Sequence, residues 1–163
     1  MIDRFAIIRL ILLLSLAATP AMADGWRPYA NARFGYVIDL PADFTVAGEA
    51  DNGDGMTLAS KDGKAELRVF GANRLQDDFA AEIRSRREMD EKDGWTIGYS
   101  KSSKTWASYS GTSRDRILYV RAISLCHDAV GYVTLEYPKA ALKEYDAVVG
   151  HLVKTLAAPP RCG

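Results

Sequence analysis

Histidine and cysteine are scarce in this chain of 163 residues, which has two of each. A zinc site needs three or four ligands, and imidazole catalysis needs a nucleophile beside the base. His127 and His151 alone are too few for a zinc site, and the sequence marks no nucleophile beside either of them. Cys126 and Cys162 stand too far apart to form a CxxC redox motif. We therefore predict no catalytic residue, no metal ligand set and no cofactor.

Net charge is also lacking, because 21 lysines and arginines balance 21 aspartates and glutamates. A protein that binds nucleic acid usually carries a basic field that attracts phosphates. Nucleic acid is therefore not an expected partner. The apolar content of 48%, with three tryptophans and eight tyrosines, argues against a disordered chain.

Long apolar runs are missing except near the N-terminus. Arg4 and Arg9 lead into the run Leu10–Ala18, which ends shortly before the small-x-small pattern Ala21-Met22-Ala23. The run is shorter than the about 20 apolar residues that span a bilayer. We predict that residues 1–23 are a cleaved secretory signal peptide and that the mature chain has no transmembrane segment.

The mature chain predicted in this way comprises residues 24–163, a length that suits a single domain. Because of the signal peptide, we expect this domain in the periplasm or outside the cell. Once Arg4, Arg9 and Asp3 are removed with the leader, 19 basic and 20 acidic side chains remain. Because exported compartments are oxidising, Cys126 and Cys162 are expected to form a structural disulfide. By the chain-entropy model, such a bridge stabilises the fold by up to roughly 4 kcal/mol.

Acidic residues and glycines are concentrated in residues 48–67, "GEADNGDGMTLASKDGKAEL", which raises the possibility of a calcium loop. In the two possible EF-hand registers, however, the first and twelfth ligand positions hold Ala50 and Lys61 or Gly48 and Ala59. The Asn-Gly and Asp-Gly dipeptides instead favour tight turns with positive φ. We predict paired strands at 56–60 and 65–70, joined at Asp62-Gly63.

Period-2 alternation over 34–40 predicts another strand, with Phe34, Tyr36, Ile38 and Leu40 on one face. Asp77 and Asp78 mark the start of a helix within 73–92, and Gly94 follows its end. The charged residues of this helix, Asp90 among them, are assigned to a solvated face, because opposite charges such as Glu82 with Arg86 and Arg84 with Glu88 are typical of one. Another short strand is expected at "FTVAG".

Four further strands are predicted at 95–100, 105–111, 116–126 and 131–137, joined by short turns that favour an antiparallel meander. Within the third of these strands, the run Ile117–Leu125 is apolar on both faces apart from Arg121 and Ser124, so we expect that strand at the centre of the sheet, covered on both faces. Pro138 then opens a helix whose apolar residues recur at three and four positions up to Leu156.

This order of elements predicts an α+β fold, with a mainly antiparallel sheet of about six to eight strands flanked by two main helices. The segments "YANARFGYVIDLPADF", "SYSGTSRDRILYVRAI" and "GYVTLEYP" resemble the PsbP-like α/β/α sandwich family. Members of that family serve mainly as binding or assembly proteins, including extrinsic subunits of a photosynthetic complex. The resemblance implies a sandwich fold and a binding role, and it carries no catalytic site.

Candidate functional residues are few. Trp106 and Tyr109 have opposite parity on one predicted strand, so we expect one of them in an exposed interaction surface. Gly111-Thr112-Ser113-Arg114-Asp115 lacks the second glycine of a nucleophile elbow. The sequence favours a binding or assembly module for an unidentified envelope or periplasmic protein. The alternative is a small enzyme or metal-binding protein in which His127 or His151 meets carboxylates in a pocket.

Overall fold

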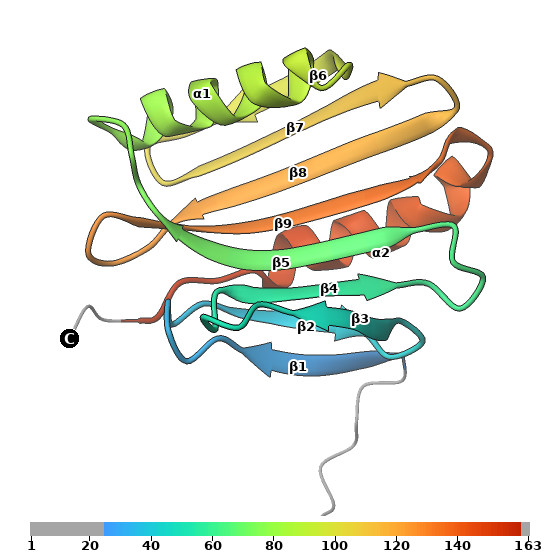
Figure 1. Cartoon of the computed structure of the whole chain (residues 1–163), viewed down its shortest axis with the longest axis horizontal. Helices are drawn as coiled ribbons and strands as arrows, with labels where there is room; N and C mark the ends of the chain where they lie inside the picture. Colours follow the sequence, from blue (N-terminus) through green and yellow to red (C-terminus); the bar gives the residue numbers. More distant parts are fainter. Residues whose placement is uncertain (1–24, 161–163) are drawn as a thin grey trace, which may run out of the picture.

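A seven-stranded antiparallel sheet forms most of the protein (Figure 1). The computed structural model describes residues 25–160, so the predicted signal peptide and Cys162 lie outside the described residues. The strands, in spatial order, are β3 (Thr45–Glu49), β4 (Gly55–Ala59), β5 (Glu66–Asn73), β9 (Ala129–Pro138), β8 (Arg116–Ser124), β7 (Trp106–Ser113) and β6 (Thr96–Ser102). The predicted α+β class and the expected six to eight strands in the sheet are confirmed.

A second sheet of two strands, which the sequence did not predict as a pair, packs beside α2. It is the hairpin of β1 (Trp26–Ala30) and β2 (Val37–Pro41). The sequence pattern did not indicate β1, because it contains Pro28 and proline is disfavoured within strands. Strand β2 begins later than predicted, because Gly35 has a φ of +74° and its N–H closes a turn onto the carbonyl of Asn31.

The hairpin in the acidic segment is confirmed. Strand β4 pairs with β5 in a register that sets Met56 opposite Val69, and Gly63 in the connecting turn has a φ of +69°. Gly55, however, is not a turn residue with positive φ as its Asp-Gly dipeptide suggested. It lies in β4, where a Cβ would collide with the backbone of Val69 and Phe70, so close strand packing requires glycine there.

Two helices flank the sheet, as predicted. Helix α1 (Phe79–Lys92) begins after Asp78, whose carboxylate accepts a hydrogen bond from the N–H of Ala81 at 2.7 Å. Helix α2 (Leu142–Thr155) follows a short 3-10 turn, η1 (Lys139–Ala141). No helix within residues 25–160 is long and apolar enough to cross a membrane.

The two helices cover opposite faces of the sheet, and each covers only half of its face. Phe79 and Ile83 of α1 belong to a core cluster with residues of β7, β8 and β9, such as Tyr109. Tyr145 and Leu152 of α2 belong to the other cluster, with residues of β2, β4, β5 and β9. Within residues 25–160, two half-faces therefore have no helix over them: β3–β5 on the α1 side, and β6–β8 on the α2 side.

The most buried strand is β9, and the prediction that 116–126 forms the centre of the sheet is wrong. Strand β9 lies fourth of the seven strands, and nearly all its residues are buried, including the polar Thr134. In β8, by contrast, Ile117, Tyr119 and Arg121 are only partly buried. Strand β9 occupies the centre because it inserts between β5 and β8, which sequence order alone does not reveal.

Candidate functional site

The half-face of β6–β8 on the α2 side, called the α2-side open face, is the first candidate site. Residues that lie directly opposite one another in neighbouring strands share a face. The strand registers therefore place three cross-strand rows on this surface: Lys101–Ser108–Arg121, Tyr99–Ser110–Tyr119 and Thr96–Thr112–Ile117. Hydroxyl groups run down its middle, and basic and aromatic side chains lie beside them.

Arg121 is the one cation of this face that is partly buried. Its guanidinium lies 4.4 Å from the ring centroid of Trp106, and its Nη1 donates a hydrogen bond to Ser108 Oγ at 3.1 Å. Its Nε is buried and has no hydrogen-bond partner among the described residues. Burial lowers the pKa of Arg121, because removing a cation from water disfavours its charged form.

Arg121 differs from most other arginines in the described part of the chain because it has no acidic partner there. Five arginines lie within 4.0 Å of a carboxylate, whereas no carboxylate of residues 25–160 lies within that distance of Arg121. The five are Arg33, Arg68, Arg74, Arg86 and Arg116. The positive charge of Arg121 is therefore not neutralised within the described structure.

A groove of about 360 Å³ continues this face between the sheet and α2. Ile117 and Tyr119 form part of its floor, and Leu142, Asp146 and Val149 of α2 line its wall. Its surroundings include two large side chains that stay about half exposed, Tyr99 at 49% and Leu142 at 51%. The α2-side open face therefore combines a basic end at Arg121 with an apolar end beside α2.

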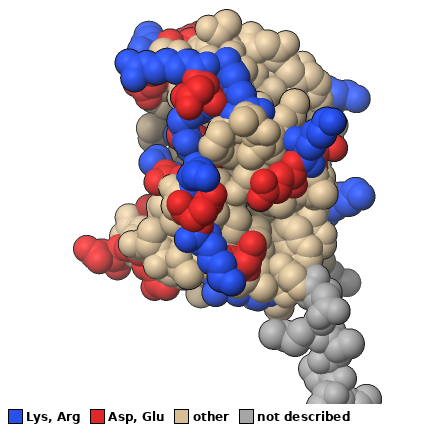
Figure 2. All heavy atoms as spheres, turned by 90° about the vertical axis from the view of Figure 1, so that its right-hand side faces the viewer, with Lys and Arg blue, Asp and Glu red and all other residues tan. Residues whose placement is uncertain are grey.

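Charge along the sequence gives a signal for this face that the composition of the whole chain hides. Residues 94–127 contain one acid, Asp115, and five bases, Lys101, Lys104, Arg114, Arg116 and Arg121. A charge count over segments could therefore have marked β6–β8 as basic. The end of the molecule that faces the viewer in Figure 2, in contrast, shows acidic and basic side chains interleaved.

The structure separates the two aromatic residues predicted for an interaction surface. Trp106 is partly buried on the α2-side open face, so its predicted role in binding stays a prediction. Tyr109 is 0% exposed beneath α1, and its inclusion in a surface is wrong. The opposite parity of the two residues places them on opposite faces of β7, and α1 covers only one of these faces.

Below α1, Tyr109 takes part in a buried polar network. Its hydroxyl donates to Asp90 Oδ2 at 2.6 Å, and Arg86 Nη2 lies 3.2 Å from Asp90 Oδ1. Asp90 is only 5% exposed, which corrects its assignment to a solvated helix face. Glu82, predicted to pair with Arg86, instead accepts hydrogen bonds from the N–H groups of Leu75 and Gln76.

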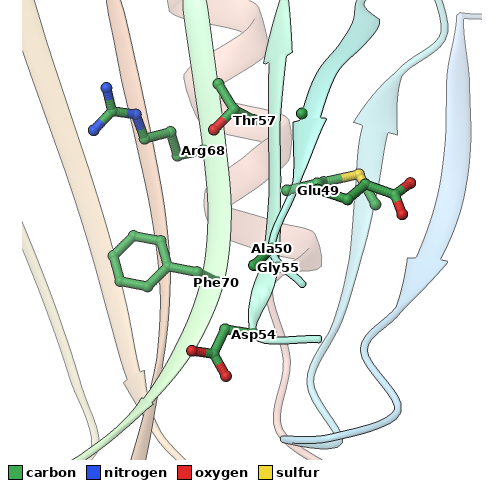
Figure 3. A pocket seen from close by; sticks show the side chains of 9 residues that line it. Glu49, Ala50, Asp54, Gly55, Thr57, Arg68 and Phe70 are labelled. Carbon is green, nitrogen blue, oxygen red and sulfur yellow. The ribbon is translucent and has the colours of Figure 1, made fainter. Parts of the chain in front are cut away.

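The half-face of β3–β5 on the α1 side, called the α1-side open face, holds a pocket of about 440 Å³ (Figure 3). Thr57 of β4 and Arg68 and Phe70 of β5 line it. Arg68 Nη2 lies 2.6 Å from Glu66 Oε1, so the cation of this pocket is already paired. Gly48 and Gly55 add no side chain to the lining, which Glu49, Ala50, Asp54 and Met56 complete.

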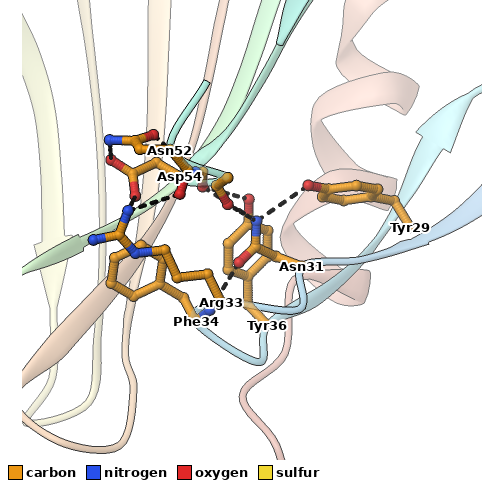
Figure 4. Close-up of polar contacts among 8 residues, drawn as sticks. Tyr29, Asn31, Arg33, Phe34, Tyr36, Asn52 and Asp54 are labelled. Carbon is orange, nitrogen blue, oxygen red and sulfur yellow. Dashed lines mark hydrogen bonds and ion pairs between the residues drawn. The ribbon is translucent and has the colours of Figure 1, made fainter. Parts of the chain in front are cut away.

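The acidic segment beside this pocket is held by the loop after β1 (Figure 4). Asn31 Nδ2 donates to the carbonyl of Gly53 at 2.9 Å, and Arg33 Nη1 lies 2.8 Å from Asp54 Oδ1. Asn52 Nδ2 also donates to Asp54 Oδ2 at 2.7 Å. These contacts give Asp54 a structural role in fixing the turn.

The two histidines lie apart from each other. His127 has a φ of +56° in the turn before β9, and it lines a small pocket with Cys126 and Arg33. His151 Nε2 lies 3.0 Å from Asp39 Oδ2, and the His151 ring stacks on Trp26 with centroids 3.7 Å apart. Within residues 25–160, no group of three histidine, cysteine, aspartate or glutamate side chains could hold a metal ion.

Among the described residues, His151 and Asp39 form the one pair that matches the alternative of a histidine/carboxylate site, but the pair lines neither open-face pocket. The predicted bridge from Cys126 to Cys162 stays a prediction, because Cys162 lies outside the described residues.

Two solved structures share this fold. Cyanobacterial PsbP (CyanoP) from Synechocystis matches with a TM-score of 0.63 and 8% identity over 87% of this chain and 98% of that one. A protein of unknown function from Pseudomonas aeruginosa matches with a TM-score of 0.52 and 16% identity, over 83% and 99% of the two chains. No family model and no curated protein sequence matches. The chain therefore has a PsbP-like fold, as its sequence segments suggested.

Proposed function

We propose that this protein is an exported binding or assembly module that holds an envelope protein on its α2-side open face. The observation that carries the proposal is that no helix of the described chain lies over this half of the sheet, which leaves Tyr99, Trp106 and Arg121 accessible to a partner. Tryptophan, tyrosine and arginine are the residue types that contribute most to binding at protein interfaces.

A protein partner suits this face better than a small molecule. The groove is open along the sheet and continues into the row of Lys101, Ser108 and Arg121, so the surface is broad and has no enclosed cavity. Small-molecule sites usually enclose most of the ligand surface. Export is supported by the sequence pattern of residues 1–23, and the PsbP-like fold agrees with a binding role.

A photo-crosslinking experiment tests the proposal. Benzoylphenylalanine is placed at Tyr99 in the full chain, which is expressed in a Gram-negative host and irradiated. Met89 on α1 is a matched control, because its side chain is also 49% exposed but lies outside the face. We expect crosslinks to a defined envelope protein from position 99 and none to that protein from position 89. Equal crosslinking at both positions, or none at 99, would contradict the proposal.

The second candidate function is a metal-binding protein or small enzyme built on His151. The observation in its favour is the 3.0 Å contact between His151 and Asp39. Metal analysis of the purified protein separates the candidates. Stoichiometric metal that is lost in His151→Ala would favour this second function, whereas metal-free protein that still crosslinks at Tyr99 favours the binding module.

A further inference from the structure

We propose that Arg121 binds a carboxylate of an acidic partner segment that lies extended along β8. This inference rests on the proposed function, and it specifies the chemistry of the partner at the α2-side open face. The segment carries an aspartate or glutamate at Arg121 and an apolar side chain in the groove beside Ile117.

The first argument is the unused hydrogen-bonding capacity of Arg121. A guanidinium has five N–H donors in a planar fork that matches a carboxylate. In this protein, Nη1 donates to Ser108, while Nη2 makes no hydrogen bond to the described residues and, unlike Nε, is not buried. Strands β6, β7 and β8 contain no aspartate or glutamate that could supply an acceptor from the same surface. A ligand carboxylate would fill this gap.

The second argument is that the guanidinium is already oriented. Trp106 lies under it at 4.4 Å, and the hydrogen bond to Ser108 fixes one edge. An arginine that is held in place loses less side-chain entropy when it binds a ligand. Charge complementarity then selects an acid, because Lys101 emerges from the same cross-strand row as Arg121.

The third argument is the spacing between the two ends of the face. Arg121 and Ile117 lie on the same face of β8, four residues apart, which corresponds to about 13 Å in a strand. Two side chains four positions apart in an extended ligand span the same distance. In a helical ligand they would be only about 6 Å apart along the axis. For a segment extended along β8, the distance therefore sets the spacing of its acid and its apolar side chain at four positions.

The apolar end of the groove favours a peptide over a free anion. Ile117 on the floor and Leu142 and Val149 on the wall offer apolar contacts that inorganic anions and small carboxylates cannot use. The groove also contains Asp146, which disfavours a second negative charge at that end. A segment with one acid and one apolar side chain therefore fits better than a run of acids.

Titration with short synthetic peptides tests the inference. The probe is an amidated peptide, uncharged except for one glutamate, with leucine four positions after that glutamate. Matched peptides replace the glutamate by glutamine or move the leucine to two positions away. NMR spectra of the labelled protein report on Arg121 Nε–H and on the indole N–H of Trp106. We expect shifts at both groups with the probe, and at least tenfold weaker binding with either matched peptide.

Variants assign the binding to Arg121. Arg121→Gln should weaken probe binding by about tenfold or more, because a charge-assisted bidentate contact is lost. Arg121→Lys should restore it only in part, since lysine keeps the charge but not the fork. Arg68→Gln on the α1-side open face is the control and should leave binding unchanged. Melting curves show that each variant is folded.

Three outcomes would overturn the inference. The first is equal binding of the glutamate and glutamine peptides, and the second is full binding by Arg121→Gln. The third is binding of acetate or of anionic phospholipid vesicles with the same dependence on Arg121, which would assign the site to a free anion or a membrane. If the probe fails while Tyr99 still crosslinks to an envelope protein, the proposed function stands and only the acidic, extended segment is rejected.

Discussion

The two faces of β7 and β8 place similar side chains in opposite situations. On the α1 side, Arg86 forms an ion pair with Asp90. Asp90 also accepts a hydrogen bond from the hydroxyl group of Tyr109. On the α2 side, Arg121 lies over Trp106 with no carboxylate from the described residues. Arg86, which belongs to α1, is paired with an acid, whereas Arg121 of β8 is partly buried without one among the described residues.

The difference indicates separate roles for the two arginines. Removing one partner of a buried ion pair is costly, and Asp90 also accepts a hydrogen bond from Tyr109 of β7, so Asp90 with its partner Arg86 helps to hold α1 on the sheet. A cation without an acid contributes little to folding, but it can gain a partner when a ligand arrives. An uncovered face does not by itself leave an arginine without an acid, because Arg68 on the α1-side open face is paired with Glu66. The lack of an acidic partner is therefore a property of Arg121 and not of open faces in general.

The side of β7 and β8 that helix α1 covers is called the closed side. The largest expected effect on stability comes from removing its acid, Asp90. Asp90→Ala leaves Arg86 without its counter-ion and Tyr109 without its acceptor, so we expect the free energy of unfolding to fall by about 3 kcal/mol. Urea unfolding followed by circular dichroism measures this. Glu91→Ala, at the exposed neighbouring position, is the control and should change stability by less than about 0.5 kcal/mol. Equal effects of the two variants would remove the special role of Asp90.

A smaller loss is expected when only the hydrogen bond is removed. Tyr109→Phe keeps the ring in its buried site but leaves Asp90 with one donor fewer, and should cost about 1.5 kcal/mol. The same urea titration applies, with Tyr99→Phe on the open side as its partner variant. Because Tyr99 is exposed, its hydroxyl should be dispensable for stability. A larger loss at Tyr99 than at Tyr109 would reverse the comparison.

Alkaline pH should weaken the closed side. Burial, followed by the hydrogen bond to Asp90, raises the pKa of Tyr109 above its ordinary value of 10.0. Above pH 10 the unfolded chain therefore loses this proton while the folded protein keeps it, so stability falls as pH rises, by up to about 1.4 kcal/mol per pH unit. Urea midpoints between pH 8 and 11 should fall less steeply in Tyr109→Phe. Identical slopes would mean that Tyr109 does not contribute.

The smallest expected effect is on the open side. Arg121→Gln should lower the free energy of unfolding by no more than about 1 kcal/mol, because the contact with Trp106 is lost but no ion pair within the described structure is. Arg86→Gln should lower it by about 2 kcal/mol. Thermal melts of the two variants in parallel make the comparison. If both variants lost a similar amount of stability, Arg121 would be a structural residue like Arg86. The proposed difference between the two faces would then be wrong.

Much of the fold could be predicted from local patterns. The start of α1 after Asp78 follows from its capping carboxylate, and the β4–β5 hairpin follows from Asp62-Gly63 between two strand-like runs. The apolar stripe of α2 gave its buried residues Tyr145 and Leu152. Strand β1 was missed because Pro28 disfavours a strand, and here it lies in a two-stranded sheet where fewer ladder hydrogen bonds are needed.

The candidate site could be predicted only in part. Trp106 was identified by parity, but the pattern did not say which of Trp106 and Tyr109 a helix would cover. Asp90 was placed on a solvated helix face because its acceptor role depends on Tyr109, which is 19 positions away and on another element. The isolation of Arg121 from acids was visible only as a charge bias over residues 94–127.

The sequence by itself determined most of the elements, β1 excepted, because turn dipeptides, caps and the periods of apolar residues act between neighbours in the chain. The tertiary structure decided that β9 lies at the centre, that each helix covers half of one face, and that Arg121 lies on an uncovered half. These outcomes depend on which strands pair over long sequence separations. Burial of apolar surface drives that pairing but has no direction of its own, so packing of the whole chain selects the arrangement.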